Sequence, residues 1–127
     1  MNIYIAGGEG EMKRFSRNAD GKSYDGGLFK DANVLQSFYY ADDWTSSVLI
    51  PNCKRFLLDS GAFTFMQASK VGKVNWDECV ERYAAFINAN KVQYFFELDI
   101  DSIVGYDRVL QLRTKLENLT GRKCIPV

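Results

Sequence analysis

Two acidic residues stand at the ends of apolar segments that have the composition of β-strands. Asp59 follows the run FLL at positions 56–58, and Asp99 follows the run YFFEL at positions 94–98. In barrel enzymes built from alternating strands and helices, the catalytic groups lie where the strands end. A carboxylate at that place can accept hydrogen bonds from a ring N–H or an exocyclic amine, or transfer a proton. The spacing of one helical crossover between the two acids predicts a shared site.

Each acid also has a purely structural interpretation. Asp-Ser-Gly is a common turn composition, so Asp59 fits a residue that caps the next turn with its side chain. Alternation along a strand places Glu97 and Asp99 on one side, where inward-facing acids are costly unless they bind something. A carboxylate that pairs with a nearby Lys or Arg fits these positions equally well. Asp101 fits the start of the following loop.

The composition limits the chemistry that the chain can perform. Its 127 residues, 46% of them apolar, are enough for one globular domain. Lys and Arg number 16, as do Asp and Glu, so net charge gives no argument for nucleic acid, although a local basic patch stays open. Histidine is absent, which excludes Ser-His-Asp and Cys-His catalysis and His-based zinc sites within this chain.

The cysteines and the N-terminus indicate a cytoplasmic protein. Cys53, Cys79 and Cys124 are odd in number and far apart, so a zinc site is not expected and the pattern fits a reducing compartment. The N-terminal sequence MNIYIAG is too short an apolar run for a signal peptide, and no run is long enough to span a membrane.

The pattern of apolar residues predicts alternating strands and helices. The expected strands are residues 3–6, 34–40, 54–58, 93–98 and 123–127. Residues 7–31 hold six of the ten glycines and are expected to form a long loop. A loop of that length is often functional, although its balanced charges also fit a solvated segment.

Capping residues place the helices between these strands. Asn75 precedes Glu78 by three residues, a capping-box pattern, and the helix after it carries one apolar face. Asp107 is the expected cap of the next helix, which Gly121 would end. Asp42 or Asp43 would cap a short helix towards residue 48. The apolar face of the first helix consists of Trp76, Val80, Tyr83, Ala84 and Ile87.

This alternation predicts an α/β fold with a parallel sheet and right-handed crossovers. About five strands do not close a barrel for which eight are typical. We therefore expect residues 1–127 to be the N-terminal part of a single (β/α) barrel domain of the TIM type, or a half-length relative that pairs with another chain.

The sequence LDSGAF at positions 58–63 resembles the Asp-Ser-Gly-Gly-Phe/Tyr-Gln motif of the tRNA-guanine transglycosylases. It is closer to the Asp-Ser-Gly-Ala-Phe form of their phage and bacterial relatives, which include enzymes that modify DNA. The segments IYIAG at 3–7, SFYY at 37–40, LD at 98–99 and IPV at 125–127 are also similar to that group.

The resemblance implies a pentosyltransferase that exchanges guanine in a polynucleotide for a 7-deazaguanine, as in queuosine formation. A carboxylate of the family attacks C1′ of the target nucleotide, and the incoming base displaces the enzyme. By position, Asp59 matches the acid that contacts the base and assists proton transfer, and Asp99 matches the acid that reads its guanine-like edge. The residues expected to bind substrate are Ser60, Gly61, Phe63, Asp99 and Asp101.

The chain also departs from the family. Ala62 replaces the second glycine of the motif, and Thr64 stands where the tRNA enzymes often carry Gln. The family's nucleophilic Asp and its zinc site belong to a C-terminal half, so this chain is expected to hold no metal or cofactor and to be inactive in exchange on its own. The partners implied are guanine or 7-deazaguanine, tRNA or DNA, and a second copy or a complementing C-terminal half, in the cytoplasm (of the host, if the source is a virus).

Two alternatives stay open. One is a non-catalytic half-barrel that self-associates or binds a nucleobase, since an unclosed sheet exposes strand edges. The other is a different barrel enzyme that acts on a nucleoside or sugar, with Asp59 and Asp99 as its acid–base pair.

Overall fold

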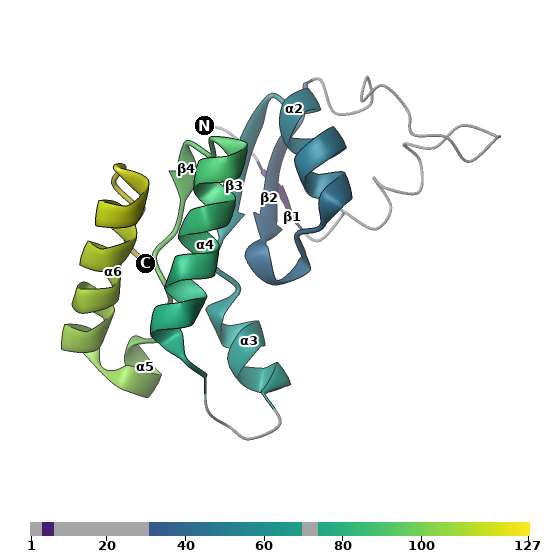
Figure 1. The fold of residues 1–127 in the computed structure, drawn as a ribbon. Helices are drawn as coiled ribbons and strands as arrows, with labels where there is room; N and C mark the ends of the chain where they lie inside the picture. The colour runs from purple at the N-terminus through teal and green to yellow at the C-terminus, as the bar shows by residue number, and fades with distance from the viewer. Residues whose placement is uncertain (1–3, 7–30, 70–73) are drawn as a thin grey trace.

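A parallel four-stranded sheet packs against the helices of the described structure (Figure 1). The computed structural model describes residues 4–6, 31–69 and 74–127, so the predicted loop lies outside the described residues except for Asp31. The strands are β1 (Ile5–Ala6), β2 (Asn33–Ser37), β3 (Arg55–Asp59) and β4 (Tyr94–Phe95), and their order in the sheet is their order in the chain.

All neighbouring strands are parallel, which confirms the predicted α/β class. Ser37 is level with Asp59, and Leu58 is level with Phe95. Beyond β4, Phe96 forms a parallel bridge with Ile125, so the C-terminal segment continues the same sequential order. The carboxyl ends of β2, β3 and β4 therefore lie along one edge of the sheet.

The helices return the chain between strands. The connection from β2 to β3 contains a 3₁₀ turn (Phe38–Tyr40), a π-helical turn (Thr45–Leu49) and α2 (Ile50–Asn52). The connection from β3 to β4 contains α3 (Ala62–Ala68) and α4 (Trp76–Asn90). After β4 come α5 (Asp101–Val104) and α6 (Tyr106–Thr120). The predicted cap of α4 is confirmed, because the Asn75 side chain accepts a hydrogen bond from the Glu78 N–H at 3.1 Å. Asp42 likewise accepts one from the Thr45 N–H at 3.1 Å.

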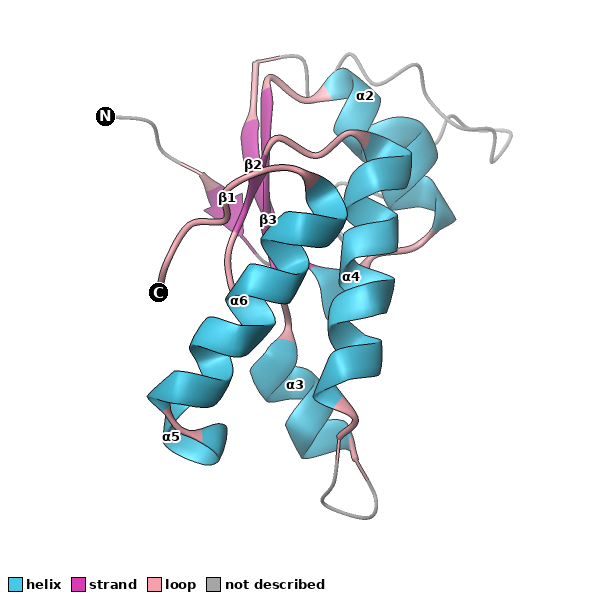
Figure 2. Ribbon diagram, turned by 60° about the vertical axis from the view of Figure 1, so that its left-hand side comes forward, coloured by secondary structure: helices cyan, strands magenta, loops and turns pink. Residues whose placement is uncertain are grey.

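Helices α2, α4 and α6 lie to one side of the sheet (Figure 2). Alternate strand residues point to that side and are buried, among them Val34, Phe56, Leu58 and Phe95. The residues between them, such as Leu35 and Leu57, are only half-buried, so the opposite face of the sheet is the more open one in the described part of the chain. The apolar stripe of α4 packs into the core, as its spacing predicts.

Tyr83 of α4 connects two strands through its hydroxyl group. Its single O–H hydrogen is shared between two backbone carbonyls, those of Leu58 at 3.2 Å and Phe96 at 2.9 Å. The side chain is fully buried, and burial raises the pKa of the phenol well above its ordinary value. A polar group with two backbone partners thus fixes α4 against the carboxyl ends of β3 and β4.

Several predicted boundaries are wrong. The second strand stops at Ser37 because its hydroxyl accepts from the Tyr39 N–H and the chain turns into the 3₁₀ segment. Asp107 is not the cap of α6: Gly105 occupies that position at φ 87°, and Asp107 lies in the first turn. The fourth predicted strand is shortened to Tyr94–Phe95, and the fifth to the single bridge at Ile125.

Gly121 ends α6 at φ 68°, as predicted. No helix among the described residues has the length and hydrophobicity needed to cross a bilayer.

Candidate functional site

A pocket with a volume of about 320 Å³ opens beside the carboxyl end of β4. The segment that follows the strand, the first half of α6 and the C-terminal segment form its walls. Its polar and aromatic lining consists of Glu97, Asp99, Asp101, Tyr106 and Arg113. This volume is at the lower end of the range for small-molecule sites.

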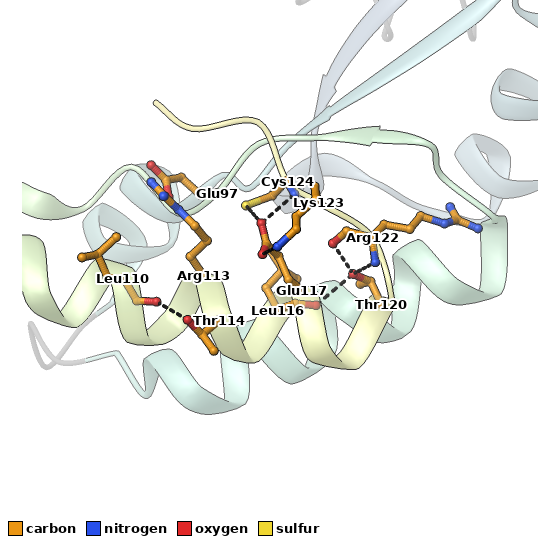
Figure 3. Close-up of polar contacts among 10 residues, drawn as sticks. All are labelled: Glu97, Leu110, Arg113, Thr114, Leu116, Glu117, Thr120, Arg122, Lys123 and Cys124. Carbon is orange, nitrogen blue, oxygen red and sulfur yellow. Dashed lines mark hydrogen bonds and ion pairs between the residues drawn. The ribbon is translucent and has the colours of Figure 1, made fainter.

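The buried Glu97 and the partly exposed Arg113 form an ion pair in the wall of the pocket (Figure 3). The Arg113 Nε donates to Glu97 Oε2 at 2.5 Å, and the Val127 N–H donates to the other carboxylate oxygen at 3.0 Å. Burial alone would raise the pKa of Glu97, but these two hydrogen bonds hold it below its ordinary value. Glu97 is therefore an anion that orients the guanidinium and holds the C-terminal segment.

A second carboxylate fastens the same segment. Glu117 of α6 accepts hydrogen bonds from the Cys124 N–H at 3.2 Å and from Lys123 Nζ at 3.0 Å (Figure 3). The Cys124 thiol lies 3.5 Å from the same carboxylate, and burial, reinforced by that negative charge, raises the pKa of Cys124 to about 12. The thiol thus stays protonated at neutral pH, and this wall of the pocket is held by α6 at two points.

Asp99 and Asp101 are available for a ligand. Neither side chain makes a hydrogen bond or ion pair with another residue that the structure describes, although both line the pocket. In Arg113, only Nε is used within the described residues, so the terminal nitrogens stay free to donate. The pocket therefore offers carboxylate acceptors and a guanidinium donor, with the exposed ring of Tyr106 at its rim.

Asp59 forms part of a turn and does not line this pocket. Its Oδ2 accepts a hydrogen bond from the Gly61 N–H at 3.1 Å, and the Ser60 hydroxyl accepts one from the Ala62 N–H at 3.3 Å. Both contacts are side-chain caps of the turn, which is what the structural interpretation of the Asp-Ser-Gly sequence predicts. The second carboxylate oxygen of Asp59 has no partner among the described residues, so the turn leaves one acceptor open.

Gly61 packs closely against the end of β2. A Cβ atom at this position would lie 2.5 Å from Ser37 Oγ and 2.9 Å from the Tyr39 backbone nitrogen, and the residue has φ 68°. Only glycine fits both the conformation and the space. The turn 59–61 and the turn 37–39 are therefore held together at the edge of the sheet where Asp59 ends β3. Phe63, also predicted to bind substrate, is 57% exposed and lies outside the pocket.

The structure adds residues that the sequence did not single out. Arg113 and Tyr106 come from α6, and their relation to Glu97 and Asp99 depends on how that helix packs. Arg113 is one turn from the buried Val109 and Leu116 of the apolar stripe, so a cation at the border of that stripe was the available signal. Tyr106 gave no signal, because an exposed aromatic at a helix start is common.

The described residues contain no group of three or more His, Cys, Asp or Glu side chains placed to hold a metal ion. Comparison with known proteins gives no relative: no protein-family model, curated protein or solved structure matches this chain.

Proposed function

We propose that the pocket beside β4 binds a guanine-like base, and that the chain is part of a (β/α) barrel protein of the tRNA-guanine transglycosylase type. The observation that carries the proposal is the pair of carboxylates, Asp99 and Asp101, in a pocket that also contains the guanidinium edge of Arg113, with neither the carboxylates nor that edge paired to a described residue. Guanine and 7-deazaguanine present adjacent N–H donors and a carbonyl acceptor on one planar edge.

The chemistry of the two partners is complementary. Ionised carboxylates only accept hydrogen bonds, so Asp99 and Asp101 select an edge that carries N–H donors. The terminal nitrogens of Arg113 would donate to the carbonyl oxygen, and the Tyr106 ring offers a surface for the face of the base. Adenine, which has a ring nitrogen acceptor where guanine has an N–H, would leave a carboxylate facing a lone pair.

The position of the pocket supports the barrel. Ligands of (β/α) barrels bind at the carboxyl ends of the strands, and the pocket adjoins the end of β4. The strand order follows the chain, the Phe96–Ile125 bridge continues it, and α2, α4 and α6 lie to one side of the sheet. These are features of an arc of such a barrel, and Asp59 ends the neighbouring strand at the same edge.

Binding without chemistry is the second candidate. It is favoured by one observation: Asp59 is engaged in its own turn and is not among the residues that line the pocket of Asp99. In that case the chain binds the base but does not catalyse its exchange.

Calorimetric titration of guanine and 7-deazaguanine into the purified chain tests the proposal. Asp99→Asn should weaken binding about tenfold or more, because a carboxylate bonded to N–H groups is worth roughly 1.5–3 kcal/mol. Asp31→Asn, which removes an exposed acid at the opposite edge of the sheet, should leave binding unchanged. Failure of the folded protein to bind either base, or equal affinity in Asp99→Asn, would refute it.

A base-exchange assay separates the two candidates. Incorporation of labelled guanine into tRNA or DNA that falls in Asp59→Ala, with base binding retained, supports the transglycosylase. Tight base binding without exchange, whether the chain is assayed alone or with a complementing C-terminal half, supports the non-catalytic protein.

A further inference from the structure

A second pocket, with a volume of about 200 Å³, lies at the amino-terminal ends of β3 and β4. It is therefore at the opposite edge of the sheet from Asp59 and Asp99. Three cationic residues line it: Lys54 and Arg55 at the start of β3, and Lys91 before β4. None of the described residues that line it is Asp or Glu. A chain of zero net charge thus gathers positive charge at one concave place.

These cations differ from most other basic residues in the described structure. Arg108, Arg113, Lys115 and Lys123 each form an ion pair with a carboxylate. In contrast, Lys54, Arg55 and Lys91 form no hydrogen bond or ion pair through their side chains with any described residue. A fourth cation, Arg122, lies beside the pocket, because its Nη1 donates to the backbone carbonyl of Val92 in the lining.

The negative C-terminal ends of the nearby helices do not neutralise these three cations. The chain leaves α2 at Cys53 and α4 at Lys91, and each helix C-terminus carries at most roughly half a negative charge. The last carbonyls of α4 are also capped, since Ile87 O accepts from the Val92 N–H at 3.0 Å. Two helix ends would thus balance about one positive charge. Lys54, Arg55 and Lys91 supply three, so the pocket keeps an excess that an anion can neutralise.

The remaining lining residues define the rest of the ligand. The Tyr94 ring is 47% exposed at the pocket, and Gln93 adds a side-chain amide. Cations next to an exposed aromatic ring are the combination with which proteins bind a phosphate and stack the base attached to it. We propose that this pocket binds a nucleotide, with the phosphate on Lys54, Arg55 and Lys91 and the base against Tyr94. This proposal does not depend on the guanine pocket, which lies at the other edge of the sheet and carries three acids and one cation among its described lining residues.

The proposal is tested by titrating AMP, inorganic pyrophosphate and adenosine into the isotopically labelled chain and following its amide resonances. AMP should cause saturable shifts at residues 53–56 and 91–94 at low ionic strength. Pyrophosphate should shift the same residues, and adenosine should bind much more weakly. Raising the salt to about 0.15 M should weaken AMP binding, because partly exposed charges are screened over about 8 Å under that condition.

Three variants make the test specific. Lys54→Gln combined with Lys91→Gln should weaken AMP binding roughly tenfold, because it removes two of the three cations while each exposed ion pair contributes only modestly. Tyr94→Ala should weaken AMP but not pyrophosphate. Arg82→Gln, which removes a cation from the exposed face of α4, is the matched control and should have no effect.

The proposal is refuted if AMP causes no saturable shift at millimolar concentration. It is also refuted if the double Lys variant binds AMP as tightly as the unmodified protein, or if Arg82→Gln weakens binding equally. None of these three results affects the guanine titration, so the two proposals fail independently.

Discussion

Replacing Gly61 with alanine should destabilise the protein more than the same change at another left-handed glycine. Gly61 and Gly121 have the same φ of 68°, so alanine costs about 1–2 kcal/mol of conformational strain at either site. They differ in space: a Cβ at Gly61 meets Ser37 Oγ at 2.5 Å and the Tyr39 nitrogen at 2.9 Å, whereas nothing lies within 4 Å of one at Gly121.

The magnitude follows from adding the two effects. Forcing an extra methyl group into a packed site costs about 1–3 kcal/mol, so Gly61→Ala should lower the free energy of unfolding by about 2–5 kcal/mol. Gly121→Ala should lower it by about 1–2 kcal/mol or less, because alanine also restricts the unfolded chain. Urea denaturation followed by circular dichroism measures both values.

A third variant tests the cause. Ser37→Ala removes the oxygen that is nearest to the added Cβ, so combining it with Gly61→Ala should recover part of the loss. Equal destabilisation by Gly61→Ala and Gly121→Ala, or no coupling between the changes at Ser37 and Gly61, would show that the two turns do not pack as described.

Three further results are expected. Arg113→Met should lower the free energy of unfolding by about 1–3 kcal/mol at neutral pH, because it leaves the Glu97 carboxylate buried without its cation. Since the pKa of Glu97 is below its ordinary value of 4.5, its ionised form stabilises the fold above that pH. That stabilisation is lost as the pH falls through the folded-state pKa, so denaturation curves of Arg113→Met and the unmodified protein should converge in acid; a constant difference down to acid pH would contradict this. Burial raises the pKa of Cys53 to about 11, so iodoacetamide should modify this thiol roughly tenfold or more slowly than an unfolded cysteine at pH about 8, as measured by mass spectrometry; equal rates would contradict the assignment. Tyr83→Phe should cost about 1 kcal/mol in urea denaturation, because backbone carbonyls at the ends of β3 and β4 lose a donor, and an unchanged midpoint would argue against those bonds.

Capping residues and apolar periodicity in the sequence predicted the helix whose limits depend on residues close together in the chain. The N-cap at Asn75 and the apolar stripe after it place α4 correctly, because both depend on residues a few positions apart. The predicted strand 93–98 is too long because an apolar run does not show where a strand loses its neighbours. The parallel α/β class is confirmed, and closure into a barrel stays a prediction.

The candidate site could be predicted only in part from the sequence, for the same reason. Asp99 could be selected because it follows an apolar segment. Whether a carboxylate is free or paired depends on a helix that comes later in the chain: Arg113 neutralises Glu97 and leaves Asp99 open. The sequence pattern is the same for Glu97 and Asp99, and only the packing of α6 determines which of the two is paired with a cation.

The sequential strand order has a consequence for how the protein is made. Each strand of the sheet pairs with the strand that precedes it in the chain, so every new element finds its partner already synthesised. Domains tend to fold from the N-terminus during translation, when chain growth is slow compared with helix and hairpin formation. The sheet can therefore grow one crossover at a time on the ribosome. The bond between Glu97 and the Val127 N–H joins residues on either side of α6, so it would form after that helix and complete the wall of the pocket beside β4.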